Sequence, residues 1–126
     1  MFIPTMPIPT RASDDNHYPW GEGCDGWRLV LHPELSLREE RLPPATAETA
    51  HRHHRAHQIF YVLAGALTIR LPGQSVTALP GDAVDVPPGV AHLVENSGAE
   101  DLRLLLFSAP DTAGDRHPVT LRPPAV

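Results

Sequence analysis

The 126-residue sequence contains no lysine, so all ten of its basic residues are arginines, and they are outnumbered by fifteen acidic residues. The formal net charge of -5 argues against non-specific binding to nucleic acid, which depends on neutralising phosphate groups. The sequence also shows no helix-turn-helix segment that could enter a major groove. We therefore expect no nucleic-acid partner.

Cysteine is almost absent as well. The single Cys24 cannot form an intramolecular disulfide, so the fold does not depend on oxidation. No apolar run approaches the length of a membrane span. The first ten residues, "MFIPTMPIPT", are apolar, but they contain three prolines and lack the basic residues of a secretory signal. These features predict a cytoplasmic protein without a membrane partner.

Proline and glycine, by contrast, are frequent, with fifteen and nine residues. Because both interrupt helices, their close spacing favours many short strands, and no amphipathic helix of ten residues or more is evident. The candidate strands alternate or are apolar throughout, and they cover residues 27–32, 35–42, 58–63, 66–71, 75–79, 83–86, 90–95 and 102–108. The fold class is therefore predicted to be all-β, a closed barrel or jelly roll.

The length suits one domain with one hydrophobic core. We expect this domain to cover residues 26–110. Residues 1–25 form an N-terminal arm in this interpretation, a candidate for packing on a dimer partner, and residues 111–126 form a proline-rich C-terminal tail.

Histidine is the residue type that most suggests chemistry, because four of the eight histidines lie between His51 and His57. His51 and His53 are two residues apart, so their side chains point to the same face of an extended strand. His92 follows a Pro-Pro-Gly turn much further along the chain. Imidazoles on adjoining strands can converge on one metal ion, and such nitrogen-rich sites suit Fe, Ni, Zn, Mn, Co or Cu.

Two motifs in this region resemble those of the cupin superfamily, in particular its small single-domain, conserved-barrel (RmlC-like) members. The first reads H-x-H, three or four residues, E, six residues and G, and it is matched by His51, His53, Gln58 and Gly65. The second reads G, five residues, P-x-G, two residues, H, three residues and N, and it is matched by Gly81, Pro87, Gly89, His92 and Asn96. The resemblance spans about residues 27–108. We expect the glycines and Pro87 to shape turns, and Asn96 to satisfy backbone groups at a turn.

The resemblance implies a double-stranded β-helix (jelly-roll) barrel, a homodimer, and one divalent metal ion held by His51, His53, Gln58 and His92. Gln58 stands where most metal-binding cupins carry glutamate. A neutral amide leaves the site about one charge unit more positive, which favours an anionic ligand or an enolate. His57 is the alternative fourth ligand. The alternation of a strand turns it to the opposite face from Gln58, unless a bulge in the preceding loop reverses the register.

Pocket residues are expected from the same alternation. Phe60 and Val62 share the parity of Gln58 and should line the metal cavity, whereas Tyr61 and Leu63 should face packing partners or a subunit interface. The remaining pocket candidates are Trp27, Arg103 and Phe107. The carboxylates that could act as a general base are Glu39, Glu40 and Glu48, although a solvated strand edge is the more ordinary role for each. We expect His17, His32, His54 and His117 to be surface residues.

Together these features predict a metal-dependent enzyme, an isomerase, lyase or dioxygenase, that acts on a small anionic organic acid or sugar acid. The alternative is a non-enzymatic module that binds a metal or a small molecule. An enzyme needs an exchangeable position on the metal and an acid or base within about 3 Å of its substrate, whereas a binding module needs neither.

Overall fold

The computed structural model describes residues 7–121, in which strands are the main secondary structure. A 3-10 turn, η1 (Asp14–Asn16), precedes the first strand. The strands are β1 (His17–Trp20), β2 (Cys24–His32), β3 (Leu35–Leu42), β4 (Thr46–Ala47), β5 (His51–Arg52), β6 (His57–Ala64), β7 (Leu67–Leu71), β8 (Gln74–Ala78), β9 (Ala83–Val86), β10 (Leu93–Asn96), β11 (Leu102–Ala109) and β12 (His117–Pro118). The predicted all-β fold is confirmed. The first six residues of the apolar N-terminal segment and the last five of the C-terminal tail lie outside the described part of the chain.

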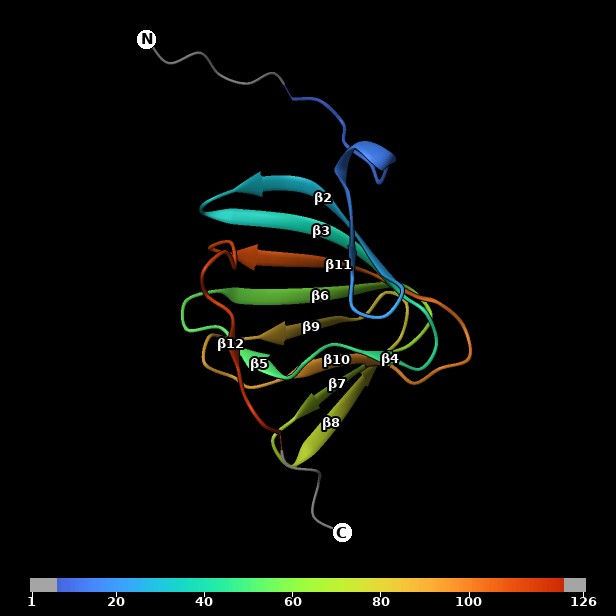
Figure 1. The fold of residues 1–126 in the computed structure, drawn as a ribbon, viewed down its shortest axis with the longest axis vertical. Coiled ribbons are helices and arrows are strands. Elements are labelled where there is room, and N and C mark those ends of the chain that lie inside the picture. Colours follow the sequence, from blue (N-terminus) through green and yellow to red (C-terminus); the bar gives the residue numbers. More distant parts are fainter. Residues whose placement is uncertain (1–6, 122–126) are drawn as a thin grey trace.

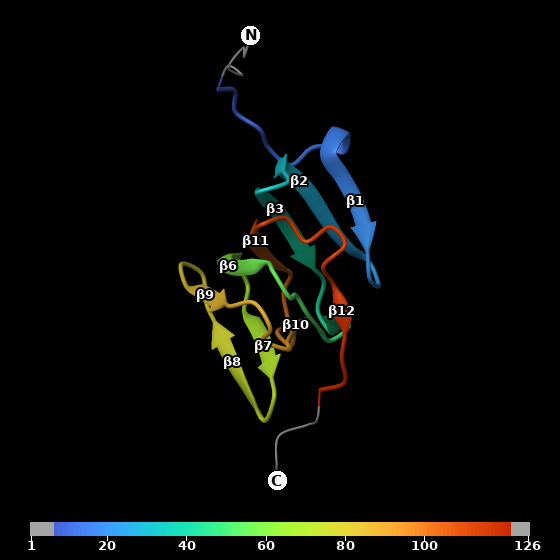
Figure 2. The same cartoon turned by 90° about the vertical axis from the view of Figure 1, so that its left-hand side faces the viewer.

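The strands form two main sheets and one small one. The six-stranded sheet has the order β1-β2-β3-β11-β6-β9, the four-stranded sheet the order β4-β10-β7-β8, and β12 pairs with β5. Figure 1 shows the larger sheet descending from β2 to β9, with β10, β7 and β8 below it. Figure 2 shows the same strands after a turn of 90°. The arrangement is the double-stranded β-helix expected from the motifs.

Side-chain alternation places the core between the sheets. On β6, Gln58, Phe60 and Val62 are buried while their neighbours are exposed. On β11, Leu102, Leu104, Leu106 and Ser108 are buried in the same way. The two strands are paired in register, with Phe60 opposite Leu106. A period of two on adjacent strands therefore makes one continuous inner face.

Gly65 of the first motif shapes a turn, and Asn96 of the second satisfies backbone groups at another, as predicted. Gly65 has a φ of +79°, and a Cβ there would lie 2.5 Å from the carbonyl oxygen of Asp101. Only glycine fits that approach. The side-chain amide of Asn96 donates to the carbonyl oxygens of Leu42 and Glu100, at 2.9 and 2.7 Å, and accepts from the backbone amide of Gly98 at 3.0 Å.

Parts of both predicted arms belong to sheets. Residues 17–25 contain β1, which pairs with β2 as the outermost strand of the larger sheet, and β12 pairs with β5 beside the histidines. Pro19 and Pro118 made these segments resemble loops. Both strands lie at sheet edges, where a residue without an N–H group is tolerated. The structured barrel therefore extends past the expected limits of residues 26 and 110.

The described residues contain no helix of ten residues or more, because η1 has three. None of the described helices is both long and apolar enough to cross a membrane.

Candidate metal centre

Three histidines from two distant parts of the chain lie close together. His51 is in β5, His53 follows it, and His92 precedes β10. His51 and His92 exchange two backbone hydrogen bonds, of 3.0 and 2.9 Å, which join the two motifs. The three side chains each offer a nitrogen within 4.8 Å of the others. This grouping has the size of a site for a single metal ion.

The hydrogen bonds of the three rings fix which nitrogen faces the centre. Nδ1 of His51 donates to the carbonyl oxygen of Thr49 at 2.8 Å, and Nδ1 of His92 donates to that of Val90 at 2.9 Å. Nδ1 of His53 donates to the carbonyl oxygen of Asp115 at 2.6 Å. Because a carbonyl oxygen only accepts, the rings of His53 and His92 carry their proton on Nδ1 and present the lone pair of Nε2. Nδ1 of His51 has a second neighbour, Nη2 of Arg116, at 3.2 Å. Such outer hydrogen bonds are typical of metal-ligating histidines.

Burial keeps these rings neutral. It lowers the pKa of His51 to about 3, and it also lowers the pKa values of His53 and His92. The Nε2 atoms of His53 and His92 are buried and have no hydrogen-bond partner among residues 7–121. A buried acceptor without a partner is costly unless something else binds it. Neutral imidazoles with free Nε2 atoms therefore fit a divalent metal ion.

Gln58 completes the donor set from β6. Its side chain is buried, and Nε2 donates to Oγ of Ser108 at 3.1 Å. Oε1 is buried and unpaired within the described residues. Gln58 lines the same pocket as His51 and His53. The amide oxygen is thus available as a fourth, uncharged ligand.

His57, the alternative ligand, lies on the other face of β6. Its ring is about half exposed and bonds to the carboxylate of Asp85 on β9. No bulge reverses the register in β6 between His57 and Tyr61, because Gln58 pairs with Val86 and the following residues continue in step. The side chain therefore points away from the three histidines.

His51, His53 and Gln58 face a cavity of about 180 Å³. Its walls come from β1, β3, β11 and the C-terminal segment, and they are formed by Tyr18, Trp20, Arg38, Glu40, Glu48, Leu106, Thr112 and Arg116. Phe60 and Val62, which were expected here, point inward but belong to the apolar core. The ring of Phe60 lies edge-on to that of His92, with 6.2 Å between centroids.

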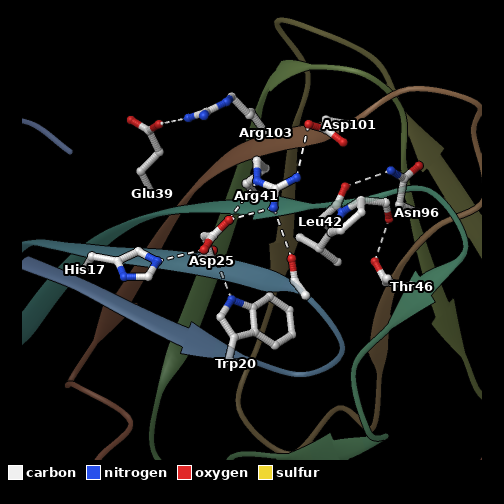
Figure 3. Close-up of polar contacts among 12 residues, drawn as sticks. His17, Trp20, Asp25, Glu39, Arg41, Leu42, Thr46, Asn96, Asp101 and Arg103 are labelled. Carbon is white, nitrogen blue, oxygen red and sulfur yellow. Dashed lines mark hydrogen bonds and ion pairs between the residues drawn. The ribbon is translucent and has the colours of Figure 1, made fainter. Parts of the chain in front are cut away.

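Trp27, Arg103 and Phe107 do not line this cavity. Arg103 and Phe107 alternate with Leu104 and Leu106 on β11, so they lie on the outer face of the sheet. There Arg103 pairs with Glu39 at 2.7 Å and lies over the ring of Trp27. Figure 3 shows this ion pair beside the neighbouring one between Arg41 and Asp25. The alternation of β11, set by its leucines, excludes Arg103 and Phe107 from the pocket.

Of the three carboxylates considered as bases, Glu40 and Glu48 reach the cavity, whereas Glu39 does not. Burial raises the pKa of Glu40 to about 7, against the opposing effect of Arg38. Burial, together with the charge of Glu40, raises the pKa of Glu48 to about 8. The pocket thus holds two acids that exchange protons near neutral pH.

Several pocket residues were not predicted from the sequence. A signal existed for Arg38, because it is separated by two and four residues from Glu40 and Leu42 and shares their face of an alternating strand. Tyr18 and Arg116 carried no such signal, since they enter the site from segments that look like arms. Asp115, whose carbonyl orients His53, belongs to the same group.

Comparison with known proteins agrees with this geometry. The model of the cupin domain matches residues 38–108. The chain belongs to the cupin family. It is also 30% identical, over 89 residues, to an uncharacterized protein of Methanocaldococcus jannaschii, an alignment covering 66% of this chain and 71% of the archaeal one.

Solved structures share the fold of this cupin. KdgF from Halomonas sp. has a TM-score of 0.72 and 23% identity, over 81% of this chain and 95% of KdgF. A predicted oxalate decarboxylase from Thermotoga maritima has a TM-score of 0.75 and 22% identity, over 82% and 100% of the chains. The polyketide cyclase RemF from Streptomyces resistomycificus has a TM-score of 0.71 and 21% identity, over 91% and 88%. At these identities the likeness concerns the fold.

Proposed function

We propose that this cupin is a metal-dependent enzyme that acts on a small anionic organic acid, as an isomerase or lyase. His51, His53, Gln58 and His92 would hold one divalent ion. The observation that carries the proposal is the set of buried, unpaired acceptor atoms, Nε2 of His53, Nε2 of His92 and Oε1 of Gln58, beside a cavity lined by Arg38 and Arg116.

The chemistry follows from the charges around the cavity. Three imidazoles and an amide are uncharged ligands, so a bound divalent ion would keep its full charge and polarise a carbonyl or enol oxygen of the substrate. The two arginines add positive charge on the wall. Glu40 and Glu48 take up or release protons near neutral pH. An anion that forms an enolate is the substrate that such a pocket stabilises best.

The names of similar structures support an enzymatic role. Two of them, a predicted oxalate decarboxylase and a polyketide cyclase, are named as enzymes. The pocket supports the same conclusion independently, because carboxyl groups with pKa values raised by burial are typical of active sites.

The metal content of the purified, untagged protein tests the proposal. We expect close to one divalent ion per chain, by elemental analysis, in the wild type. The double variant His51→Ala, His92→Ala should hold almost none. His54→Ala is the matched control, since His54 is exposed and stacks on His117 instead. A wild type that remains empty after incubation with Fe, Ni, Zn, Mn, Co or Cu would refute the proposal.

We also propose a homodimer, which the family resemblance implies. The outer face of the larger sheet exposes Ile59, Tyr61 and Phe107, which lie on the adjacent strands β6 and β11. Covering an apolar sheet face with a second copy removes it from water.

A further inference from the structure

Strand β3 carries an arginine and a glutamate on the inner face of the barrel. Arg38 and Glu40 lie opposite Leu106 and Leu104 of β11, whose side chains point inward. Charged residues on the interior face of a small barrel are unusual and lose hydration there. Both side chains line the cavity in front of the histidines.

The guanidinium group of Arg38 forms only long hydrogen bonds within the described part of the protein. Nη2 donates to Asp111 at 3.3 Å and Nη1 to Oγ1 of Thr112 at 3.5 Å, both longer than usual for such donors. Nε is buried and has no partner among the described residues. A carboxylate is the group that matches two parallel donors of a guanidinium.

Glu40 is held beside Arg38 without forming an ion pair with it. Within residues 7–121, the ion pair of Arg38 is with Asp111. Oε2 of Glu40 accepts from the hydroxyl of Tyr18 at 3.4 Å. The other titratable or charged groups of the pocket are Glu48, Arg116, His51 and His53. Burial raises the pKa of Glu40 to about 7, the range in which a carboxyl group serves both as base and as acid.

The placement of Tyr18 is itself specific. Its ring lies against Gly26, where a Cβ would come within 2.1 Å of the ring, and under the guanidinium of Arg28 at 4.2 Å. Glycine at this point of β2 lets the hydroxyl reach Glu40 across the sheet. The Tyr18–Glu40 contact is therefore built into the fold.

We propose that Arg38 binds the carboxylate of the substrate and that Glu40 transfers a proton to and from its reacting carbon, so that the substrates are small 2-oxo acids or their enol forms. This inference rests on the proposed function and names the substrate class and the residues for that same pocket. A cavity of about 180 Å³ lies below the range of drug-sized sites, which suits an acid of a few carbon atoms.

The proposed step balances without an oxidant. The C–H bond next to the carbonyl carbon breaks, its proton bonds to a carboxylate oxygen of Glu40, and its electron pair forms the C=C bond of an enolate. The negative charge moves to the former carbonyl oxygen. Glu40 then returns a proton, either to the same carbon, which exchanges the hydrogen, or to another atom, which gives the isomer. Tyr18 keeps Glu40 in place, and Arg38 keeps the carboxylate away from it.

Carboxylate binding is tested first in the metal-free protein, with pyruvate, 2-oxobutyrate and 2-oxoglutarate as probes in NMR titrations. We expect at least one probe to bind the wild type. Arg38→Gln should weaken this binding tenfold or more, and Arg38→Lys less, because lysine keeps the charge but not the paired donors. Arg103→Gln is the matched control on the outer face. Thermal unfolding shows whether each variant is folded. Equal affinity in folded Arg38→Gln, or no binding of any probe, would overturn the assignment of Arg38.

Proton transfer is tested in the metal-loaded protein by following deuterium uptake at C3 of the bound probe in D2O, with proton NMR. The wild type should exchange this hydrogen, and Glu40→Gln should exchange it at least 100-fold more slowly while binding the anionic probe at least as tightly, since a negative charge is removed from the pocket. Glu39→Gln, one residue away and outward-facing, should match the wild type. Exchange by Glu40→Gln at the wild-type rate, or none by the wild type, would overturn the role of Glu40. Failure of the proposed function is distinguishable, because it appears as missing metal in elemental analysis, while binding of the probes is measured without metal.

Discussion

Nδ1 of His53 donates a hydrogen bond of 2.6 Å to the carbonyl oxygen of Asp115, in the segment that follows the barrel. The carboxylate of the same Asp115 accepts from the backbone amides of His54, Arg55 and Ala56, at 2.8 to 3.0 Å. One residue near the end of the chain therefore orients a candidate ligand and holds the loop that follows it. Although burial favours the protonated acid, these amides keep the pKa of Asp115 below its ordinary value.

Replacing Asp115 by asparagine should weaken metal binding. The asparagine keeps one acceptor oxygen but turns an NH2 group towards backbone amides, so the loop shifts and His53 loses its fixed orientation. We expect the metal dissociation constant, measured by competition with a chelator, to rise roughly 10- to 100-fold. Asp85→Asn is the control, because Asp85 is exposed and pairs with His57. An unchanged dissociation constant in Asp115→Asn would show that Asp115 does not position His53.

Gln58→Glu should change metal and anion binding in opposite directions. The added negative charge strengthens the attraction for a divalent ion and lowers the net positive charge that an anionic ligand meets. The metal dissociation constant should fall, and binding of pyruvate to the metal-loaded protein should become weaker. Both are measurable by calorimetry. If Gln58→Glu bound both more tightly, the uncharged amide would have no role in anion preference.

The sequence was sufficient to predict the barrel and to bring three histidines and Gln58 to one place, because short-range rules determine both. The alternation of β6 separates Gln58 from His57, and Gly65, which has a positive φ, marks a turn. The role of Asn96, whose side chain satisfies backbone groups at a turn, could be predicted from short-range sequence for the same reason.

The residues that form the pocket walls could not be predicted from short-range patterns, because they reach the site through contacts between segments that are distant in the sequence. Tyr18 and Arg116 come from segments with the composition of arms and reach the site only through edge-strand pairing. Arg103 and Phe107 were misplaced for a different reason. A run of three leucines, 104–106, hides the alternation of β11, so the inner face is evident only from its pairing with β6.

The two pocket acids should make the stability of the metal-free protein decrease as pH rises above neutrality. Their pKa values are raised from 4.5 to about 7 for Glu40 and about 8 for Glu48, so the folded protein holds protons that the unfolded chain has released. This stabilisation is complete below about pH 4.5 and is lost as pH passes through 7 and 8. The histidines with lowered pKa values make the stability increase with pH, but only below about pH 6.5, where the unfolded chain binds protons that the folded protein does not. Between pH 6.5 and 8.5 the glutamates therefore determine the slope.

Thermal unfolding of the metal-free protein at several pH values checks this sign. The unfolding temperature should drop between pH 6.5 and 8.5 in the wild type, and the drop should shrink in the double variant Glu40→Gln, Glu48→Gln. Glutamine at position 48 keeps the acceptor for the backbone amide of Val94. A wild-type unfolding temperature that rises over this interval would contradict the raised pKa values.

The outer face of the larger sheet should form the dimer interface. Tyr61 and Phe107, 39% and 40% exposed, lie on this face, so arginines in their place put two unpaired charges into an apolar contact. Tyr61→Arg combined with Phe107→Arg should shift the mass in analytical ultracentrifugation from dimer to monomer. Leu79→Arg, at a 56% exposed position after β8, should stay dimeric. A monomeric wild type, or a dimeric double variant, would exclude this interface.

Neighbouring leucines on β11 provide a test of the fold itself. Leu104 is fully buried in the core, whereas Leu105 lies half-buried on the outer face. Truncation of a buried leucine removes its packing and leaves a cavity, so Leu104→Ala should lower the free energy of unfolding by about 2–5 kcal/mol. Leu105→Ala removes the same atoms from a wetter position and should cost clearly less. Urea unfolding of both variants measures the difference. Equal losses would mean that the two faces of β11 are not distinguished as the alternation requires.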